Sequence, residues 1–215
     1  MKQQSTYWHD PNAQKPYALY IHGFASSAKS GTKLSMGRIL DDYEWLSPEI
    51  THDPYESLGI LNEWAAAFRP ALITGTSMGG LLAMYVDCPT AVKVAVNPCI
   101  EIERVLRKFG YGKHPYLQPR ENDETEFVID EPMIQKFIRF RAENQPVPGA
   151  RNIALFSTDD ELIGHEFTKK NAALLESMGY EILWGSKFGH RCNEQACKQI
   201  KQALQTTKKE DDCPL

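Results

Sequence analysis

The segment G-T-S-M-G, residues 75–79, has the residue types and spacing that expose a nucleophilic serine. An apolar run (71–75) leads into it and a helical pattern (78–87) follows it. A serine on such a sharp strand-to-helix turn needs glycines two residues to either side, because larger side chains would collide there. The N–H of Met78 then points from the helix N-terminus toward the oxygen that gains charge during acyl transfer. The pattern predicts a nucleophile at Ser77 and an oxyanion donor at the Met78 N–H.

A nucleophilic serine needs a base, and the base needs an orienting carboxylate. For a serine in this turn, the expected chain order is serine, acid, histidine, each at the end of a strand. His190 is the one histidine of six that follows the acidic candidates and also lies at the end of an apolar run. The acids lie in T-D-D-E (158–161), after the apolar run 152–157. We favour Asp160 and keep Asp159 as the alternative, and we expect the other acids of this cluster to be solvated or to cap a helix.

The loop after the first apolar run allows two interpretations. Residues 23–30 read G-F-A-S-S-A-K-S, one residue short of the phosphate-binding pattern G-x-x-x-x-G-K-[ST], because Ala28 replaces the second glycine. The same loop could supply a second oxyanion donor, since Gly23 permits the turn and the Phe24 N–H would face the substrate oxygen. The phosphate interpretation leaves the serine turn and His190 unexplained, so we favour the oxyanion interpretation.

Short apolar runs alternate with amphipathic segments along the chain, which indicates an α/β fold with a parallel sheet. The expected strands are 17–22, 44–50, 71–75, 92–97, 152–157 and 180–185. The expected helices between them are 32–42, 58–69, 78–87, 165–178 and 192–205. Residues 97–151 contain no good strand pattern, and helical patterns at 101–109 and 131–144 predict a small helical lid insertion over about 100–150.

The composition is that of a globular protein, with 42% hydrophobic and 24% charged residues among 215. We expect one domain over residues 1–215, with a flexible tail over about 206–215. A net charge of −4 disfavours nucleic acid and anionic membranes as partners. The N-terminus lacks the apolar core of a secretory signal, no apolar run is long enough to span a membrane, and the five cysteines are scattered. These features predict a cytoplasmic protein. Cys192 and Cys197 are too few ligands for a metal site.

Together these residues resemble the α/β-hydrolase fold, and more narrowly the small bacterial YqiA-like esterases. The similarity lies in LYIHGFASSAKS, GTSMGGLLAMY, VAVNPCIEIERVL, HPYL, STDDELIGH and GHRC, spread from about residue 17 to 204. The resemblance implies a three-layer fold, with a mostly parallel sheet of about six strands and helices on both faces. It also implies the triad Ser77, Asp160 and His190, and no metal or organic cofactor. One departure is Asp159, which stands where the family usually has the glycine of G-D-E, so the choice of acid stays open.

The resemblance implies esterase activity on short acyl esters, so the predicted function is that of a serine esterase, which hydrolyses a small-molecule ester through an acyl-enzyme intermediate. A thioesterase or another acyl hydrolase would use the same triad, and a non-catalytic interaction module on this fold is a further alternative. In the lid, Tyr111, His114, Tyr116 and Leu117 either form part of the acyl pocket or pack over the edge of the sheet. The sequence is compatible with a homo-oligomer and does not determine the acyl-chain length.

Overall fold

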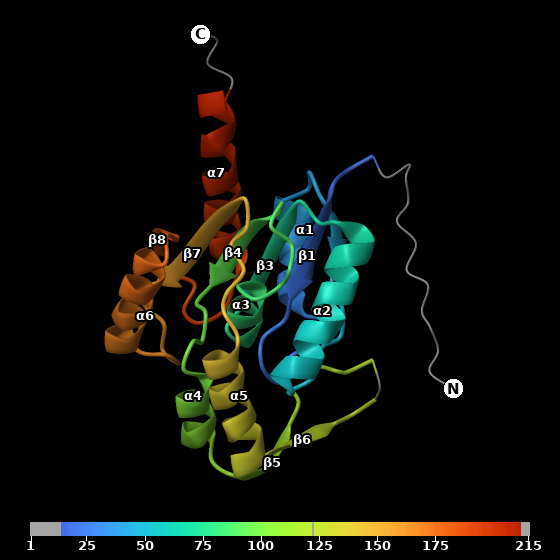
Figure 1. The fold of residues 1–215 in the computed structure, drawn as a ribbon, viewed down its shortest axis with the longest axis vertical. Helices are drawn as coiled ribbons and strands as arrows, with labels where there is room; N and C mark the ends of the chain where they lie inside the picture. The colour runs from blue at the N-terminus through green and yellow to red at the C-terminus, as the bar shows by residue number, and fades with distance from the viewer. Residues whose placement is uncertain (1–13, 122, 212–215) are drawn as a thin grey trace.

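A six-stranded parallel sheet forms the centre of the molecule (Figure 1). The computed structural model describes residues 14–121 and 123–211. The strand order is β2-β1-β3-β4-β7-β8, and every neighbouring pair is parallel. The strands are β1 (Tyr17–Ile21), β2 (Glu44–Leu46), β3 (Leu72–Thr76), β4 (Val92–Val96), β7 (Arg151–Ser157) and β8 (Glu181–Gly185). The predicted α/β class and the sheet of about six strands are confirmed.

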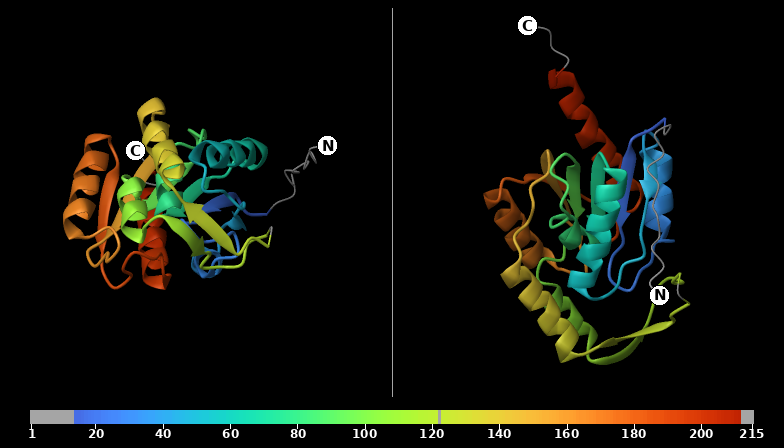
Figure 2. Two further views of the ribbon diagram at one scale, coloured as in Figure 1. Left: turned by 90° about the horizontal axis from the view of Figure 1, so that it is seen from below. Right: turned by 45° about the vertical axis from the view of Figure 1, so that its right-hand side comes forward.

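Helices cover both faces of this sheet and make three layers (Figure 2). One face packs against α1 (Gly31–Ile39) and α7 (Glu194–Asp211); the other packs against α2 (Pro54–Phe68), α3 (Met78–Ala83) and α6 (His165–Ser177). The pleat of β1 explains why both faces are apolar, because successive side chains point to opposite sides of a strand. Ala18 and Tyr20 belong to the core beside α1 and α7, whereas Leu19 and Ile21 belong to the other core.

Strand β2 and helix α2 have boundaries that differ from those expected. Strand β2 ends at Leu46, so residues 47–50 form a connection instead of the predicted continuation of the strand. Helix α2 begins at Pro54, four residues before the predicted start. The Asp53 side chain explains that start, because it accepts hydrogen bonds from the amides of Tyr55 and Glu56 and so caps the helix.

Helix α7 continues to Asp211, past the predicted end at residue 205. It therefore overlaps the predicted flexible tail, of which residues 212–215 lie outside the described residues.

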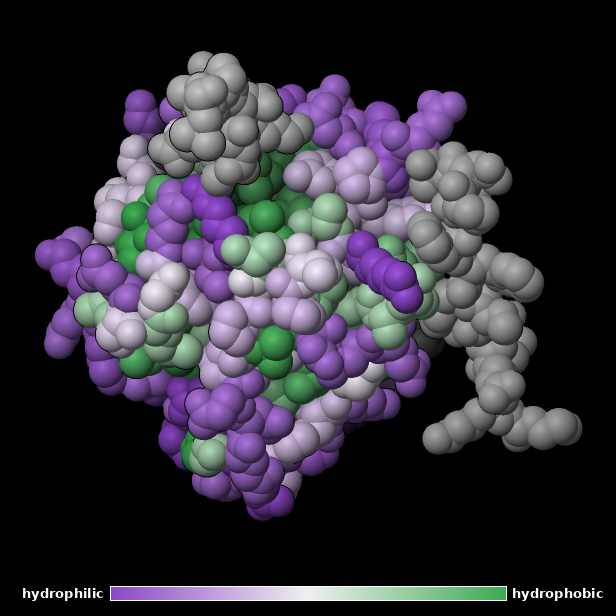
Figure 3. All heavy atoms as spheres, turned by 45° about the horizontal axis from the view of Figure 1, so that its top comes forward, coloured by the Kyte–Doolittle hydropathy of each residue, from purple (hydrophilic) through white to green (hydrophobic). Residues whose placement is uncertain are grey.

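Within the described ranges, no helix is both long enough and apolar enough to cross a membrane. The surface toward the amino ends of the strands is mostly polar, with scattered apolar side chains (Figure 3).

The insertion between β4 and β7 is not purely helical. It contains α4 (Ile102–Phe109), β5 (Gly112–Pro115), β6 (Glu126–Ile129) and α5 (Glu131–Glu143). The prediction that this segment contains no strand is wrong, because β5 and β6 form a separate antiparallel hairpin. The hairpin pairs His114 with Phe127 and Lys113 with Val128. Phe127 and Ile129 are buried while Val128 is exposed, which is the alternation of a strand with one covered face.

A lysine side chain lies inside the sheet core. Lys93 of β4 is 1% exposed, and its Nζ donates hydrogen bonds to the carbonyls of Val86 and Val147, both at 2.6 Å. These contacts tie the end of the α3 segment to the chain that enters β7. Burial lowers the pKa of Lys93 from 10.5 to about 8, because the charged form has lost its hydration.

Between about pH 8 and pH 10.5, the wild type should gain stability relative to a Lys93→Met variant. In this window the unfolded chain still holds the proton on Lys93, whereas the native protein has released it, so a rising pH favours the native state. The difference in free energy of unfolding should grow by at most about 1.4 kcal/mol per pH unit. Urea unfolding of both proteins at several pH values measures it, and titrations common to both cancel. Parallel stability curves would contradict the lowered pKa.

Candidate active site

Ser77 lies on a strained turn between β3 and α3, as the sequence predicts. Its backbone has φ 59° and ψ −117°, a conformation that side chains other than glycine rarely adopt. The flanking glycines are sterically required. A Cβ on Gly75 would lie 2.2 Å from the carbonyl oxygen of Gly79, and one on Gly79 would lie 2.1 Å from that of Ile21. Helix α3 begins at Met78, so the Met78 N–H is one of the free donors at a helix N-terminus.

His190 and Asp160 are in direct contact at the ends of β8 and β7. His190 Nδ1 lies 2.8 Å from Asp160 Oδ2, and both residues are buried. The other oxygen of Asp160, Oδ1, accepts hydrogen bonds from the amides of Leu162 and Ile163, at 3.0 and 2.9 Å. The carboxylate is thus held from one side while it orients the imidazole from the other. His190 Nε2 is buried and has no hydrogen-bond partner among the described residues.

The end of β4 links Ser77 to His190. The Ser77 N–H donates to the carbonyl of Val96 at 3.0 Å. The next residue, Asn97, donates from Nδ2 to the carbonyls of His190 and Gly189, at 3.1 and 2.9 Å. Among the described residues, no hydrogen bond joins the Ser77 hydroxyl to His190 directly. In enzymes without substrate this contact is often longer than a hydrogen bond. Sequence reasoning missed Asn97, although its place as the last residue of a predicted strand was a usable signal.

The two acids beside Asp160 are exposed, as expected for the other acids of this cluster, and their carboxylates also hold the histidine loop. Asp159 Oδ2 accepts a hydrogen bond from the Lys187 amide at 3.1 Å, and its Oδ1 accepts from the Ser157 hydroxyl. The Ser157 hydroxyl and the loop amides hold the pKa of Asp159 below its usual value. Glu161 Oε2 accepts from the His190 backbone N–H at 2.9 Å. Asp160, rather than Asp159, therefore contacts the imidazole.

The loop after β1 packs directly on the serine turn. A Cβ on Gly23 would lie 3.2 Å from the Thr76 carbonyl and 3.5 Å from the Cβ of Ser77, so the loop and the serine turn are in close contact here. The Gly23 carbonyl accepts hydrogen bonds from the Ser26 amide, at 3.2 Å, and from His22 Nδ1, at 3.0 Å. In a trans peptide the carbonyl and the N–H point in opposite directions. Fixing the Gly23 carbonyl therefore fixes the direction of the Phe24 N–H.

An aromatic cluster of side chains covers this loop. Phe24 stacks on His52 at a centroid distance of 4.1 Å and meets Phe127 of β6 edge to face at 5.1 Å. Tyr116 packs against Phe127 and His52. Burial, with a further contribution from the Arg120 charge, lowers the pKa of His52 to about 3, so this imidazole is neutral. His52 Nε2 accepts a hydrogen bond from the Ala25 amide at 3.4 Å.

The four lid residues singled out in the sequence divide into two groups. His114 stacks on Phe127 at 5.7 Å, and Tyr116 also belongs to the aromatic cluster. Tyr111 and Leu117 are exposed, at 61% and 65%. Among the described residues, no group of three or more histidine, cysteine, aspartate or glutamate side chains is placed to hold a metal ion.

Solved structures with the same fold are esterases and hydrolases by description. The esterase domain of a Rhodothermus marinus protein is 18% identical, with a TM-score of 0.60 over 94% of this chain and 90% of that one. Est1E from Butyrivibrio proteoclasticus is 16% identical, with a TM-score of 0.65 over 93% of this chain and 89% of that one. Mouse alpha/beta hydrolase domain-containing protein 10 is 9% identical, with a TM-score of 0.59 over 91% of this chain and 90% of that one. At these identities the likeness establishes the fold alone.

Two sequence comparisons complete this result. No curated protein sequence gives a match. The model described as an uncharacterised protein family, UPF0227, matches residues 17–207, which is most of the chain. The predicted three-layer α/β-hydrolase architecture is confirmed, and the chain belongs to UPF0227, the YqiA-like family of that fold.

Proposed function

We propose that the protein is a serine esterase that hydrolyses short-chain acyl esters through Ser77, His190 and Asp160. The observation that supports this most is the buried His190–Asp160 pair, whose unpaired Nε2 lies at the strand ends where Ser77 occupies a strained turn. A strained, glycine-dependent serine beside an oriented imidazole has no evident structural purpose. This argues against a purely non-catalytic module.

The proposed reaction has two acyl-transfer steps. Ser77 Oγ attacks the ester carbonyl while its proton passes to His190 Nε2, and Asp160 stabilises the imidazolium that forms. The negative charge on the carbonyl oxygen is taken by the N–H groups of Phe24 and Met78. His190 then gives its proton to the leaving alcohol. In the second step His190 takes a proton from water, which attacks the acyl-enzyme. His190 then gives that proton to Ser77 Oγ as the bond to the acyl group breaks, which releases the acid and restores the free enzyme.

A preference for short acyl groups is supported by the surroundings of the loop after β1, residues 23–30, which we call the oxyanion loop. Ser77 is 9% exposed, and the aromatic side chains of Phe24, His52 and Phe127 pack together on the loop whose Gly23 lies against the serine turn. Such closely packed aromatic rings leave little space for a long alkyl chain. We propose a small-molecule ester as the substrate, because the hairpin and the two helices of the insertion lie over this end of the sheet (Figure 2).

A panel of p-nitrophenyl esters from acetate to octanoate tests this function. We expect hydrolysis of the acetate and butyrate esters, with kcat/KM falling as the chain lengthens. An acetyl thioester and methyl ferulate extend the panel, the latter because Est1E has been solved with ferulic acid bound. A higher kcat/KM on the thioester would replace the esterase assignment by a thioesterase one. No hydrolysis of any member would contradict the proposal.

A further inference from the structure

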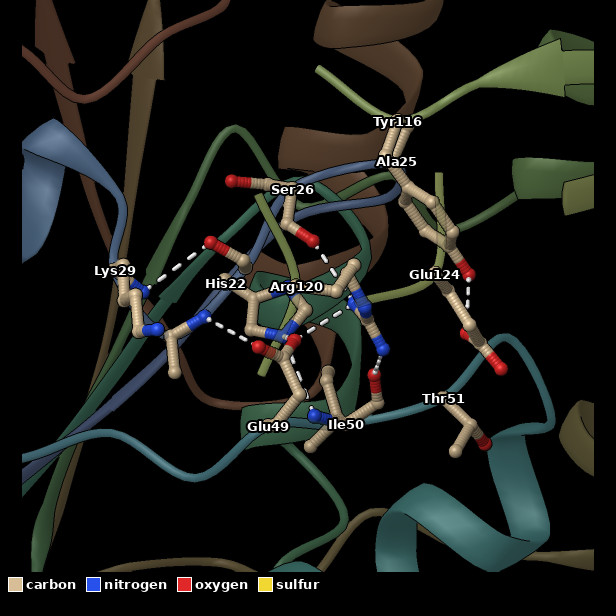
Figure 4. A network of polar contacts seen from close by, with 12 residues as sticks. His22, Ala25, Ser26, Lys29, Glu49, Ile50, Thr51, Tyr116, Arg120 and Glu124 are labelled. Atoms are coloured by element: carbon tan, nitrogen blue, oxygen red, sulfur yellow. Dashed lines mark hydrogen bonds and ion pairs between the residues drawn. The ribbon is translucent and has the colours of Figure 1, made fainter. Parts of the chain in front are cut away.

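A cluster of buried charges lies beneath the oxyanion loop and draws its members from three parts of the chain (Figure 4). His22 directly follows β1, Glu49 follows β2, and Arg120 lies in the connection between β5 and β6. The His22 and Arg120 side chains are 1% and 2% exposed, and that of Glu49 is 14% exposed. Charged groups are rarely buried unless they are paired, so this cluster needs an explanation.

Arg120 joins the oxyanion loop to the connection after β2 through the two ends of its guanidinium group. Nη1 donates to the Ser26 carbonyl at 2.9 Å and lies 2.7 Å from Glu49 Oε1. Nη2 donates to the Ile50 carbonyl at 2.7 Å, and the guanidinium carbon lies 4.7 Å from the centre of the Tyr116 ring. A planar fork with fixed donor directions suits this arrangement, which one lysine ammonium could satisfy only in part.

Glu49 connects Arg120 to two further positions, the Ala28 amide in the oxyanion loop and the His22 side chain. Its Oε2 accepts a hydrogen bond from the Ala28 amide at 3.3 Å, and its Oε1 lies 3.0 Å from His22 Nε2. Burial alone would raise the pKa of Glu49, but the neighbouring His22 and Arg120 lower it below its ordinary value. Glu49 is therefore an anion at neutral pH, held between two basic side chains.

His22 completes the path to the oxyanion donor. Nδ1 must carry a hydrogen, because its partner, the Gly23 carbonyl, can only accept. This holds in both charge states of the ring. A neutral His22 accepts the Ile50 N–H at Nε2, at 3.2 Å, whereas a protonated one donates from Nε2 to Glu49. In either case the Gly23 carbonyl is fixed, and with it the direction of the Phe24 N–H.

We propose that Arg120 is a positioning residue for the oxyanion hole, acting through Ser26 and the Glu49–His22 pair on the peptide that contains the Phe24 N–H. This inference rests on the proposed function, since it concerns the same oxyanion. A second contact strengthens the link, because the Leu117 amide donates to the Ala25 carbonyl at 2.8 Å. In this proposal the connection between β5 and β6 positions the oxyanion donor, in addition to packing over the end of the sheet.

The test compares Arg120→Met with Arg141→Met. Arg141 is a matched control in the same insertion: it pairs with Glu103 at 2.6 Å and donates to the Ile100 carbonyl, but it has no contact with the oxyanion loop in the described structure. For each variant we would measure kcat and KM on a short p-nitrophenyl ester. We would also measure inhibition by a trifluoromethyl ketone, whose serine adduct places an oxyanion in the hole.

For Arg120→Met we expect kcat to fall by about 10- to 100-fold, with KM changed by less than about threefold. The inhibition constant of the ketone should rise by the same factor as kcat falls. Hydrogen exchange of the Ser26 and Ala28 amides should be faster than in the wild type. Arg120→Lys restores the positive charge but not the planar guanidinium group, so its kcat should lie between those of Arg120→Met and the wild type. This variant replaces Arg120→Met in the test if the methionine variant does not fold.

Two outcomes overturn the inference, and they can be told apart. If the wild type hydrolyses esters but Arg120→Met and Arg120→Lys match Arg141→Met in kcat and ketone affinity, Arg120 is only structural and the proposed function stands. If the wild type hydrolyses no ester and the ketone does not bind, the proposed function fails and this role fails with it.

Discussion

Replacing Ser77 by alanine should reduce kcat/KM for p-nitrophenyl acetate by on the order of 10⁴-fold or more, because the acyl-enzyme can no longer form. The fold should be unaffected. Alanine keeps the Cβ atom and the same strained backbone at φ 59°, so no new collision arises. Steady-state rates at neutral pH, together with thermal unfolding of both proteins, measure the two effects separately.

Ser57→Ala is the matched control for that variant. Ser57 is a fully buried serine in α2, and its hydroxyl donates to the Thr51 carbonyl at 2.8 Å. The same hydroxyl accepts a hydrogen bond from the Thr51 amide at 3.1 Å. Its loss removes both hydrogen bonds and should cost about 1–3 kcal/mol of stability, with activity close to that of the wild type. If Ser77→Ala kept more than a tenth of the wild-type activity, the reaction would use another nucleophile.

The second large effect should separate the two adjacent aspartates. Asp160→Asn should lower kcat by about 10⁴-fold, because an amide facing His190 Nδ1 favours the wrong tautomer of the imidazole. Asp159→Asn removes the same charge one residue away, but among the described residues the Asp159 carboxylate is hydrogen-bonded to the loop amides and the Ser157 hydroxyl, not to the imidazole. Its cost in kcat should be about tenfold or less, the effect of weakened hydrogen bonds.

The kinetic comparison of these variants is direct, because both are conservative and both lie in the same turn. Circular dichroism and thermal unfolding establish that each is folded before its rate is measured. Equal losses in the two variants, or a larger loss in Asp159→Asn, would contradict the assignment of Asp160 as the partner of the imidazole.

The positions of the proposed triad could be predicted from the sequence because local signals mark them. The serine turn depends on Gly75 and Gly79, and the histidine and the acids follow recognisable strands. The choice between Asp159 and Asp160 could not be made in this way, since neighbouring residues in a turn point in different directions. The amides of Leu162 and Ile163 decide it by fixing the Asp160 carboxylate.

The hairpin in the insertion was missed for a different reason. Strands β5 and β6 have only four residues each, and β5 begins with a glycine and ends with a proline. Such residues are unfavourable in strands, and the pairing compensates for this propensity. The Arg120 network could not be predicted either. Arg120 and Ser26 are 94 positions apart, and no local pattern indicates which buried carbonyl an arginine will reach.

Covalent trapping of the nucleophile tests the central claim most directly. The wild type would be incubated with a fluorophosphonate, its intact mass measured, and the modified peptide sequenced by mass spectrometry. We expect one adduct per chain, located on Ser77, and no adduct on the Ser77→Ala variant. The absence of an adduct on the folded wild type, or an adduct on another residue, would contradict the assignment of this protein as a serine hydrolase acting through Ser77.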